Sequence, residues 1–416
     1  MRCLVDGITH RGEGVARING KAAFIPFAIP GEEIDIEITL DRSRFSRGKI
    51  TNIIAPSLDR VAPPCQHYYR CGGCAYQHVN YERQLKLKKQ VVADALHRIG
   101  QQKIAVQDVI GMDNPWYYRN KVTWQTGETK GEKRLGYYQL DSHIHLPISD
   151  CLLLSPEIKK FSQFLDCYLG VTGINKGQQV VIRQDSDHGK LFLIVEGPVD
   201  REGLESLVKG YPGLESLFIY ENNKLEHIFG SDRLNFNIDD HPYQVSPLAF
   251  FQVNNQQTRR LYDEVKKAAG IEGKKQILDA YCGTGSIAIY LAAQHDSVTG
   301  VDEFAPSIKD AKNNAKINML INCEFYDGAC EKIIPELKQD FDTVILDPPR
   351  AGCHRDLLQV LDDKKVAQII YVSCNPATLA RDIKILCESS YNVESVQPID
   401  MFPWTSHIEN CVLLSK

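Results

Sequence analysis

The sequence lacks any long apolar run. No stretch approaches the roughly eighteen consecutive apolar residues that a membrane-spanning helix needs, so we predict no transmembrane segment. The opening residues 1–7 contain no apolar core of a secretory leader, and we expect a cytoplasmic protein. In that compartment thiols stay reduced, which makes the thirteen cysteines candidates for free, catalytic or metal-bound groups rather than for disulfides.

The sequence also lacks a strong excess of one charge. Its net charge of −5 argues against a protein that coats nucleic acid uniformly. The charges are unevenly spread, however, because residues 41–100 contain eleven Lys or Arg and four acids, a local charge of +7 that leaves −12 for the remainder. A basic segment on an acidic body is compatible with a local phosphate-binding face, although a solvated helix flank gives the same pattern.

Internal repeats and low-complexity segments are absent as well, and 416 residues suffice for two or three domains. Residues 1–56 contain short strands around the hairpin signal Asn19-Gly20, which predicts a small β-barrel. Residues 57–250 combine a Pro- and Cys-rich stretch, a helix over 79–99 and strands of an antiparallel sheet, an α+β pattern. In residues 251–416 strands alternate with helices, which predicts an α/β domain with a parallel sheet.

The third region opens with a glycine loop. The predicted strand 276–282 is followed by Gly283-Thr284-Gly285 and a helix that begins at Ser286. Glycines let the backbone turn sharply and approach a ligand closely, at the partly positive end of the helix. The segment also fits the dinucleotide pattern Gly-x-Gly-x-x-Ala, so a nicotinamide cofactor stays an alternative at this point.

Acids at successive strand ends favour S-adenosyl-L-methionine over NAD. Asp279, four residues before the first glycine, is placed to pair with an ammonium group, which the methionine part of S-adenosylmethionine has and nicotinamide cofactors lack. Asp302 closes the next strand and is placed for a ribose diol, and Asp327 for the adenine. Asp347 begins the sequence Asp-Pro-Pro-Arg, a rigid loop over the crevice where open α/β sheets bind ligands.

A cysteine lies one loop further along the same sheet edge. Cys374 follows the apolar strand 369–372 and precedes Asn375-Pro376 and a helix that starts near Ala377. We predict that the helix N-terminus lowers the pKa of this thiol and makes it a nucleophile; a packed, inert thiol is the alternative. A final strand over 410–414, predicted to pair antiparallel at the sheet edge, brings Glu409 back toward Cys374.

Four other cysteines form a ligand pattern. Cys65, Cys71 and Cys74 have the spacing C-x5-C-x2-C with two glycines between the last pair, and Cys151 is the best candidate for a fourth ligand. Four thiolates suit either zinc or a [4Fe–4S] cluster, and the spacing alone leaves both open beside unligated thiols.

Taken together, these motifs resemble one family along essentially the whole chain. The glycine loop, Asp347-Pro348-Pro349-Arg350, Ser373-Cys374-Asn375-Pro376 and His407-Ile408-Glu409 are similar, in order and spacing, to the RNA (uracil-5-)-methyltransferases that use S-adenosylmethionine. Residues 1–55, with Gly12-Glu13-Gly14-Val15-Ala16, resemble the family's N-terminal TRAM domain, an OB-like RNA-binding barrel. The resemblance implies a class I methyltransferase domain in the C-terminal region.

It also implies roles for single residues. Cys374 is expected to be the nucleophile and Glu409 the base. The cofactor and base pocket is expected to comprise Gln252, Asp279, Tyr281, Gly283, Gly285, Ser286, Asp302, Asp327 and Asp347. At Asp302 this family more often has glutamate, which makes the ribose contact the least secure. The four cysteines match the ligands of a [4Fe–4S] cluster.

The substrate expected from the resemblance is RNA. The barrel and the four cysteines favour 23S rRNA, with tRNA as the other candidate, and no obligate protein partner is evident. Three rivals remain: a cytosine-5 methyltransferase, a dehydrogenase, and an RNA-binding assembly factor without activity.

Overall fold

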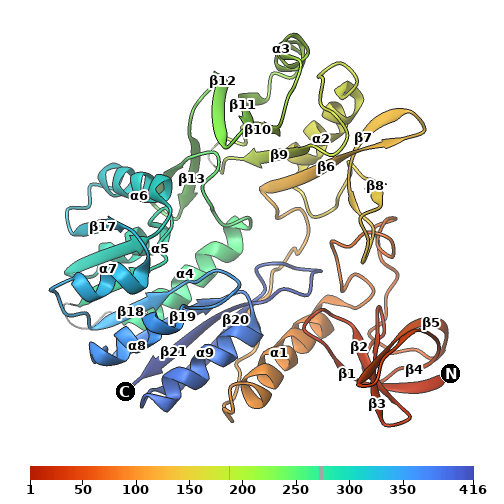
Figure 1. Cartoon of the computed structure of the whole chain (residues 1–416), viewed down its shortest axis with the longest axis horizontal. Helices are drawn as coiled ribbons and strands as arrows, with labels where there is room; N and C mark the ends of the chain where they lie inside the picture. Colours follow the sequence, from red (N-terminus) through yellow and green to blue (C-terminus); the bar gives the residue numbers. More distant parts are fainter. Residues whose placement is uncertain (187, 271–274) are drawn as a thin grey trace.

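The computed structural model describes residues 1–186, 188–270 and 275–416, and it divides into three regions along the chain (Figure 1). A closed barrel at the N-terminus is followed by a central sheet and then by a C-terminal sheet covered with helices. The predicted fold class is confirmed. No helix in the described part of the chain is long and apolar enough to cross a membrane.

The N-terminal region is a five-stranded barrel. Its strands pair in the order β1-β2-β3-β5-β4 and close on themselves. Asn19 and Gly20 turn between the second and third strands with φ of 50° and 80°, as a type I′ hairpin requires. The first strand was not predicted from the sequence. The bounds are β1 (Arg2–Ile8), β2 (Gly14–Ile18), β3 (Lys21–Ile25), β4 (Glu33–Asp41) and β5 (Phe45–Ala55).

The barrel packs closely against the cysteine-rich stretch that follows it. Gly12, at φ 80°, allows this approach, because a Cβ there would lie 2.9 Å from the Cβ of Ala75. A larger residue at this turn would therefore push the barrel away from residues 75–76.

The central region is a seven-stranded sheet in the order β12-β11-β10-β9-β6-β7-β8. The sequence predicted an antiparallel sheet, and this is wrong for one pair: β10 and β11 run parallel because helix α3 crosses over between them. The bounds are β6 (Lys121–Thr129), β7 (Glu132–Tyr138), β8 (His145–Pro147), α2 (Pro156–Tyr168), β9 (Gln179–Gln184), β10 (Leu191–Glu196), α3 (Arg201–Gly210), β11 (Leu214–Glu221) and β12 (Lys224–Gly230).

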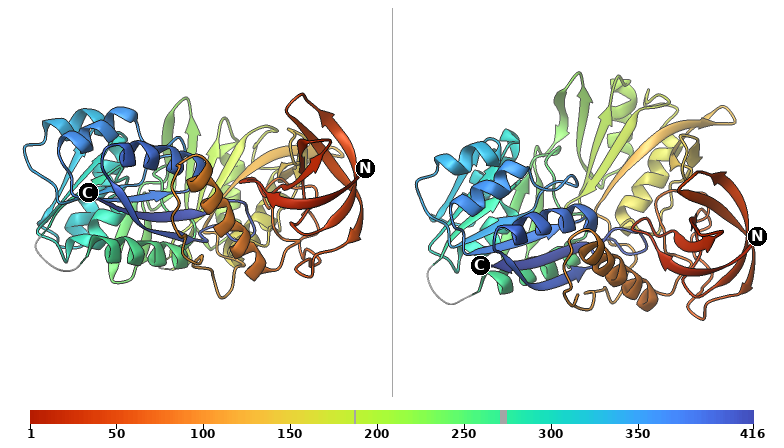
Figure 2. Two further views of the ribbon diagram at one scale, coloured as in Figure 1. Left: turned by 90° about the horizontal axis from the view of Figure 1, so that it is seen from below. Right: turned by 60° about the horizontal axis from the view of Figure 1, so that its bottom comes forward.

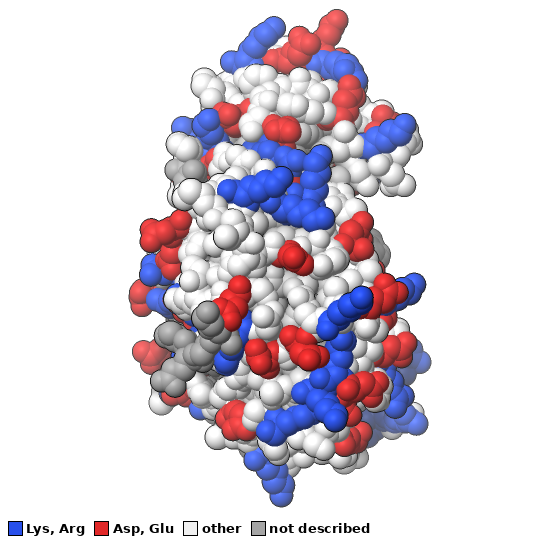
Figure 3. All heavy atoms as spheres, turned by 90° about the vertical axis from the view of Figure 1, so that its left-hand side faces the viewer, with Lys and Arg blue, Asp and Glu red and all other residues white. Residues whose placement is uncertain are grey.

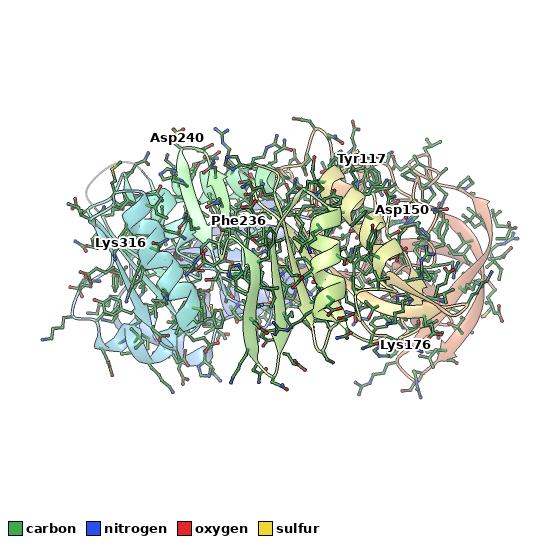
Figure 4. The ribbon with its side chains drawn as sticks, turned by 90° about the horizontal axis from the view of Figure 1, so that it is seen from above. Tyr117, Asp150, Lys176, Phe236, Asp240 and Lys316 are labelled. Carbon is green, nitrogen blue, oxygen red and sulfur yellow. The ribbon has the colours of Figure 1, made fainter. Side chains whose placement is uncertain are left out.

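A hairpin, β13 (Leu234–Ile238) and β14 (His241–Val245), joins this sheet to the C-terminal half. Phe236, labelled in Figure 4, lies between the two halves and stacks on Phe251 with ring centroids 4.3 Å apart. The buried side chain of Arg183 donates to the carbonyls of Pro247 and Ala249, at 2.8 and 2.9 Å. These contacts fix the segment that leads to Gln252.

The C-terminal region is a seven-stranded, mostly parallel sheet in the order β17-β16-β15-β18-β19-β21-β20. Helices α4–α6 cover one face and α7–α9 the other, so successive strand residues such as Ile277 and Leu278 enter opposite cores. The bounds are α4 (Asn255–Ala269), β15 (Gln276–Ala280), α5 (Ser286–Ala292), β16 (Ser297–Asp302), α6 (Ala305–Ile317), β17 (Cys323–Asp327), α7 (Cys330–Glu336), β18 (Thr343–Leu346), α8 (Arg355–Asp363), β19 (Gln368–Ser373), α9 (Pro376–Glu388), β20 (Asn392–Ile399) and β21 (Glu409–Ser415).

The last strand does not lie at the sheet edge, so that prediction is wrong. β21 runs antiparallel, as expected, but it is inserted between β19 and β20, and β20 forms the edge. Asn410 therefore faces Ser373 across the ladder, which places Glu409 beside the loop that carries Cys374.

Helix α1 (Tyr81–Arg98) joins the C-terminal core rather than the central sheet. It lies beside α9 in both views of Figure 2, and Val92 and Leu96 share a buried cluster with Leu379 and Ile383. The buried Lys88 Nζ is 2.5 Å from Asp400 Oδ1 and also donates to the carbonyl of Phe402. This buried ion pair fixes residues 400–408, called here the β20–β21 loop, which leads directly to Glu409.

Candidate active site

The carboxyl ends of the parallel strands carry buried acids. Asp279, which is 1% exposed, accepts a hydrogen bond from the N–H of Ala288 at 3.0 Å through Oδ2. Its Oδ1 is buried and has no hydrogen-bond partner in the described part of the chain. Burial, and then the charges of Asp347 and Asp302, raise the pKa of this carboxyl well above its usual range. An unpartnered buried carboxylate oxygen is suited to a cationic ligand group, as predicted for an ammonium.

The glycine loop has the geometry expected for close ligand approach. Gly283 and Gly285 have φ of 53° and 75°, which side chains rarely adopt. Asp302 uses its carboxylate to support this loop, accepting from the N–H groups of Gly283 at 3.0 Å and Phe304 at 2.8 Å. Each of its oxygens keeps a further lone pair for a ribose hydroxyl.

Two of the other predicted pocket residues lie at the same edge. Asp327 ends β17 directly opposite Asp302 and is exposed. Ser286 begins α5, and its hydroxyl is 2.7 Å from the hydroxyl of Tyr262.

The last two predicted pocket residues, Tyr281 and Gln252, are held in place by hydrogen bonds to other residues. Tyr281 has φ 65°, and its hydroxyl accepts from the N–H of His354 at 3.4 Å, which directs the ring toward the loop after β18. Gln252 is buried, and its backbone carbonyl accepts from Asn120 Nδ2 at 3.1 Å. That hydrogen bond holds the segment before α4 against the start of β6.

Cys374, Glu409 and Asp347 come together with one guanidinium, that of Arg350. Burial, and then the charge of Asp347, raise the pKa of Glu409 well above its usual range, and Arg350 opposes the shift. Burial also raises the pKa of Asp347 to about 7. The carboxyls are therefore held where their negative charges repel one another.

The lowered thiol pKa predicted for Cys374 is wrong for the protein without ligands. Burial raises it to about 11, with Glu409 and Asp347 adding to the shift and Arg350 opposing it. Although α9 begins at Pro376, Asn375 caps it by accepting from the N–H of Ala377, and the helix end does not outweigh burial and two neighbouring carboxyls.

Sequence reasoning gave Arg350 and His407 no role of their own. Arg350 Nη2 is 3.5 Å from His407 Nε2, and the guanidinium lowers the pKa of the Cys374 thiol. The available signal was its position, directly after Asp-Pro-Pro at a strand end.

The four predicted ligand cysteines line one cavity of about 240 Å³. The N–H of Gly73 donates to the sulfur of Cys71 at 3.4 Å and Gln77 Nε2 donates to that of Cys74 at 3.2 Å. Burial raises the pKa of Cys151 to about 11, and the nearby Cys71 and Cys65 add to the shift. Within the described residues, no three or more His, Cys, Asp or Glu side chains are grouped closely enough to hold a single metal ion.

Residues 65–76, called here the cysteine loop, carry Cys65, Cys71 and Cys74 and contact the barrel, the central sheet and the C-terminal region. The N–H groups of Ala75 and Tyr76 donate to the carbonyl of Trp404 in the β20–β21 loop, at 2.8 and 3.0 Å. The backbone of Cys71 forms an isolated antiparallel β-bridge with Gln139, which follows β7. His67 Nε2 lies 3.3 Å from Oδ1 of Asp150, which Figure 4 labels near the barrel. The cysteine loop thus ties the central sheet to the loop before Glu409.

Just over half of the basic side chains in residues 41–100 form ion pairs in the fold. Of the eleven basic residues there, six form ion pairs within the described residues: Arg47, Arg60, Arg83, Lys88, Lys89 and Arg98. Figure 3 shows another face, the one on the left of Figure 1, where Lys and Arg side chains gather in one patch and lie beside Asp and Glu elsewhere.

The fold and this strand-end site define a class I methyltransferase with an N-terminal RNA-binding barrel. Comparison with known proteins specifies the family. The profile described as tRNA (Uracil-5-)-methyltransferase matches residues 221–416, and that of the TRAM domain matches residues 1–51.

Relatives and a solved structure agree with these matches. An uncharacterized RNA methyltransferase of Halalkalibacterium halodurans is 36% identical over 437 aligned residues, covering 99% of this chain and 95% of its own. One from Clostridium tetani is 35% identical over the same length and coverage. The Pyrococcus abyssi tRNA (uracil-54, C5)-methyltransferase, solved with S-adenosyl-L-homocysteine, covers all of both chains with a TM-score of 0.78 and 26% identity. The chain belongs to the S-adenosylmethionine-dependent RNA (uracil-5-)-methyltransferase family.

The effect of the Arg350 guanidinium on the Cys374 thiol can be tested. Because Arg350 lowers the pKa of Cys374, Arg350→Gln is expected to raise it further and to slow alkylation of Cys374 by iodoacetamide by about three- to tenfold at pH 8–9. The rate is measured by mass spectrometry of the peptide that contains Cys374. Arg355→Gln, which removes an exposed guanidinium at the start of α8, is the control and should react like the wild type. Equal rates in all three proteins would show that Arg350 does not act on the thiol.

Proposed function

We propose that the protein acts in the cytoplasm and transfers a methyl group from S-adenosylmethionine to C5 of a specific uridine in 23S rRNA. The observation that carries the proposal is the meeting of Cys374, Glu409, Asp347 and Arg350 beside the buried, unpartnered oxygen of Asp279. The residues fit the methyl donor: Asp279 would hold its ammonium and Asp302 its ribose, and Asp327 lies where adenine is expected.

The chemistry needs both a nucleophile and a base because C5 of uracil is a weak nucleophile. Cys374 Sγ adds to C6, and the electron pair displaced from the C5–C6 bond makes C5 electron-rich. S-adenosylmethionine, when bound, supplies an electrophilic methyl group. Glu409 then takes the proton from C5, the double bond re-forms and the C6–S bond breaks, which returns the thiolate. Arg350 stabilises that thiolate.

The site explains how a thiol with a raised pKa reacts. Two buried carboxyls disfavour the thiolate in the empty pocket, whereas a bound sulfonium or ammonium cation reverses their effect. We therefore expect the thiolate to form chiefly when the cofactor is present. The uridine itself has to leave any base stack before its ring face reaches Cys374.

The four cysteines support the second cofactor in this proposal, a [4Fe–4S] cluster. Their side chains line one cavity of about 240 Å³, and the N–H groups of Gly73 and Gln77 donate to the sulfurs of Cys71 and Cys74; four thiolates are a ligand set of such a cluster. When bound, the cluster would be held by Cys65, Cys71, Cys74 and Cys151. We assign it no electron-transfer step and expect it to hold the cysteine loop against the β20–β21 loop.

Transfer RNA is the second candidate substrate, because the structurally similar Pyrococcus abyssi enzyme is named for a tRNA uridine. A strain whose copy carries Cys374→Ala decides between the two. We expect loss of at least one 5-methyluridine from 23S rRNA and retention of the tRNA mark, as measured by mass spectrometry of nuclease digests. A strain with restored wild-type protein is the control. Loss of the tRNA mark alone would refute the ribosomal assignment.

The base assignment is tested by Glu409→Gln. Without a base, methylation should proceed but elimination should stall, so RNA stays covalently attached to Cys374 and appears as a band resistant to denaturant on a gel. Adding Cys374→Ala to the variant should abolish the band. Glu394→Gln, an exposed change on the neighbouring strand β20, should turn over normally. Free turnover by Glu409→Gln would contradict its role as the base.

The cluster is tested by composition. Protein purified without oxygen is expected to be brown and to contain iron and acid-labile sulfide in equal amounts, and Cys65→Ser should lose both. Cys167→Ser, at an exposed cysteine outside the cavity, is the matched control and should keep them. Zinc as the only metal in the colourless wild-type protein would overturn the iron–sulfur proposal.

A further inference from the structure

A second pocket, of about 140 Å³, lies between the barrel, the cysteine loop and the β20–β21 loop. The barrel contributes Glu13 and Phe27 to its walls, the cysteine loop Gly73, the loop after β7 Asp141, and the β20–β21 loop Ser406 and His407. It shares Gly72, Gly73, Cys74, Thr405 and His407 with the four-cysteine cavity. The methyl-transfer chemistry described above uses none of its walls.

The charges around this pocket cancel. Arg47 Nη1 lies 3.1 Å from Glu13 and 3.6 Å from Asp141, so one guanidinium spans two carboxylates, and the exposed Arg11 offsets the second. His407 is neutral, because burial and the nearby Arg350 lower its pKa to about 4. The hydroxyl of Ser406 has no hydrogen bond within the described residues and is available to a ligand. A neutral, polar pocket suits a nucleobase better than a phosphate.

One wall of the pocket is aromatic and strained. Phe27 has φ 64°, a left-handed conformation that bulky side chains avoid and that persists where the surroundings impose it. Its ring is partly buried and contacts Tyr68, Tyr69 and His78 edge-on, with centroids 5.4, 5.1 and 5.9 Å apart, and Phe27 itself lines the pocket. Aromatic rings are surfaces on which proteins stack unpaired bases.

The pocket is connected to the catalytic thiol by direct contacts. Ser406 and His407 precede Glu409 by three and two residues. His407 Nε2 is 3.5 Å from Arg350, whose guanidinium lowers the pKa of Cys374. The pocket and the thiol are therefore linked through His407 and Arg350.

We propose that this pocket binds the base of a nucleotide flanking the target uridine, stacked on Phe27 and hydrogen-bonded to Ser406 and Glu13. The inference rests on the proposed function and adds a specificity site to it. Phe27 and Glu13 belong to the barrel region and Ser406 to the C-terminal region. In this proposal the barrel therefore contributes to recognition of the RNA sequence beside the target uridine.

The test combines one variant with altered RNA. The probe is a synthetic single-stranded RNA centred on the mapped uridine, with a series in which each flanking nucleotide in turn is abasic. For the wild type, one abasic position should raise KM about tenfold and leave kcat unchanged. Phe27→Gly, which removes the ring and suits the left-handed backbone, should raise KM similarly on intact RNA and abolish the response to that position.

Met319→Gly is the matched control. Met319 also has a positive φ, of 55°, and is 88% exposed, but it lies in the turn after α6, so its variant should behave like the wild type. The inference would be overturned if KM of Phe27→Gly changed with every abasic RNA as KM of the wild type does. It would also be overturned if KM of the wild type changed with none of them. A wild type that methylates no uridine would overturn the proposed function itself.

Crosslinking gives an answer that does not depend on the folding of a variant. A 4-thiouridine at the sensitive flanking position should crosslink on irradiation to the wild-type peptide that contains Phe27 or Ser406. Crosslinks found only on other peptides would place the flanking base elsewhere and refute the pocket.

Discussion

Electrostatic repulsion among buried acids organises the active site. Asp279, Asp347 and Glu409 lie along one sheet edge with the thiol of Cys374, and Arg350 is the cation that acts on Glu409 and the thiol. Burying like charges together is unfavourable, so the empty pocket holds its acids partly protonated and its thiol inactive. The same arrangement favours a ligand that carries positive charge on both its ammonium and its sulfonium. In the proposed reaction, affinity for the methyl donor and formation of the Cys374 thiolate thus have one physical origin.

Contacts from α1, from the cysteine loop and from Trp116 hold the β20–β21 loop in position. Lys88 of α1 holds the loop's first residue, Asp400, through a buried ion pair. The cysteine loop donates two hydrogen bonds to the carbonyl of Trp404, and the Trp404 ring stacks on Trp116 with centroids 4.3 Å apart. Elements from separate parts of the sequence thereby converge on the residues that precede Glu409.

Features formed by residues close together in the sequence could be predicted from it, whereas features that depend on contacts between distant residues could not. The glycine loop, the acids at strand ends and the C-x5-C-x2-C spacing are local patterns; the structure places the acids and the glycine loop at one sheet edge, and the four cysteines line one cavity, where their role as cluster ligands stays a prediction. The interior position of β21 and the parallel pairing of β10 with β11 depend on topology, which periodicity does not encode. The pKa of Cys374 and the pairing of the basic residues depend on neighbours distant in sequence, such as Glu409 for the thiol and Asp400 for Lys88.

The interior position of β21 has a mechanical consequence. A strand bonded to neighbours on both sides cannot shift along its axis without breaking hydrogen bonds in two ladders at once, so the backbone that carries Glu409 is held from both sides. Sliding this strand would cost more than moving a strand at the sheet edge, such as β20.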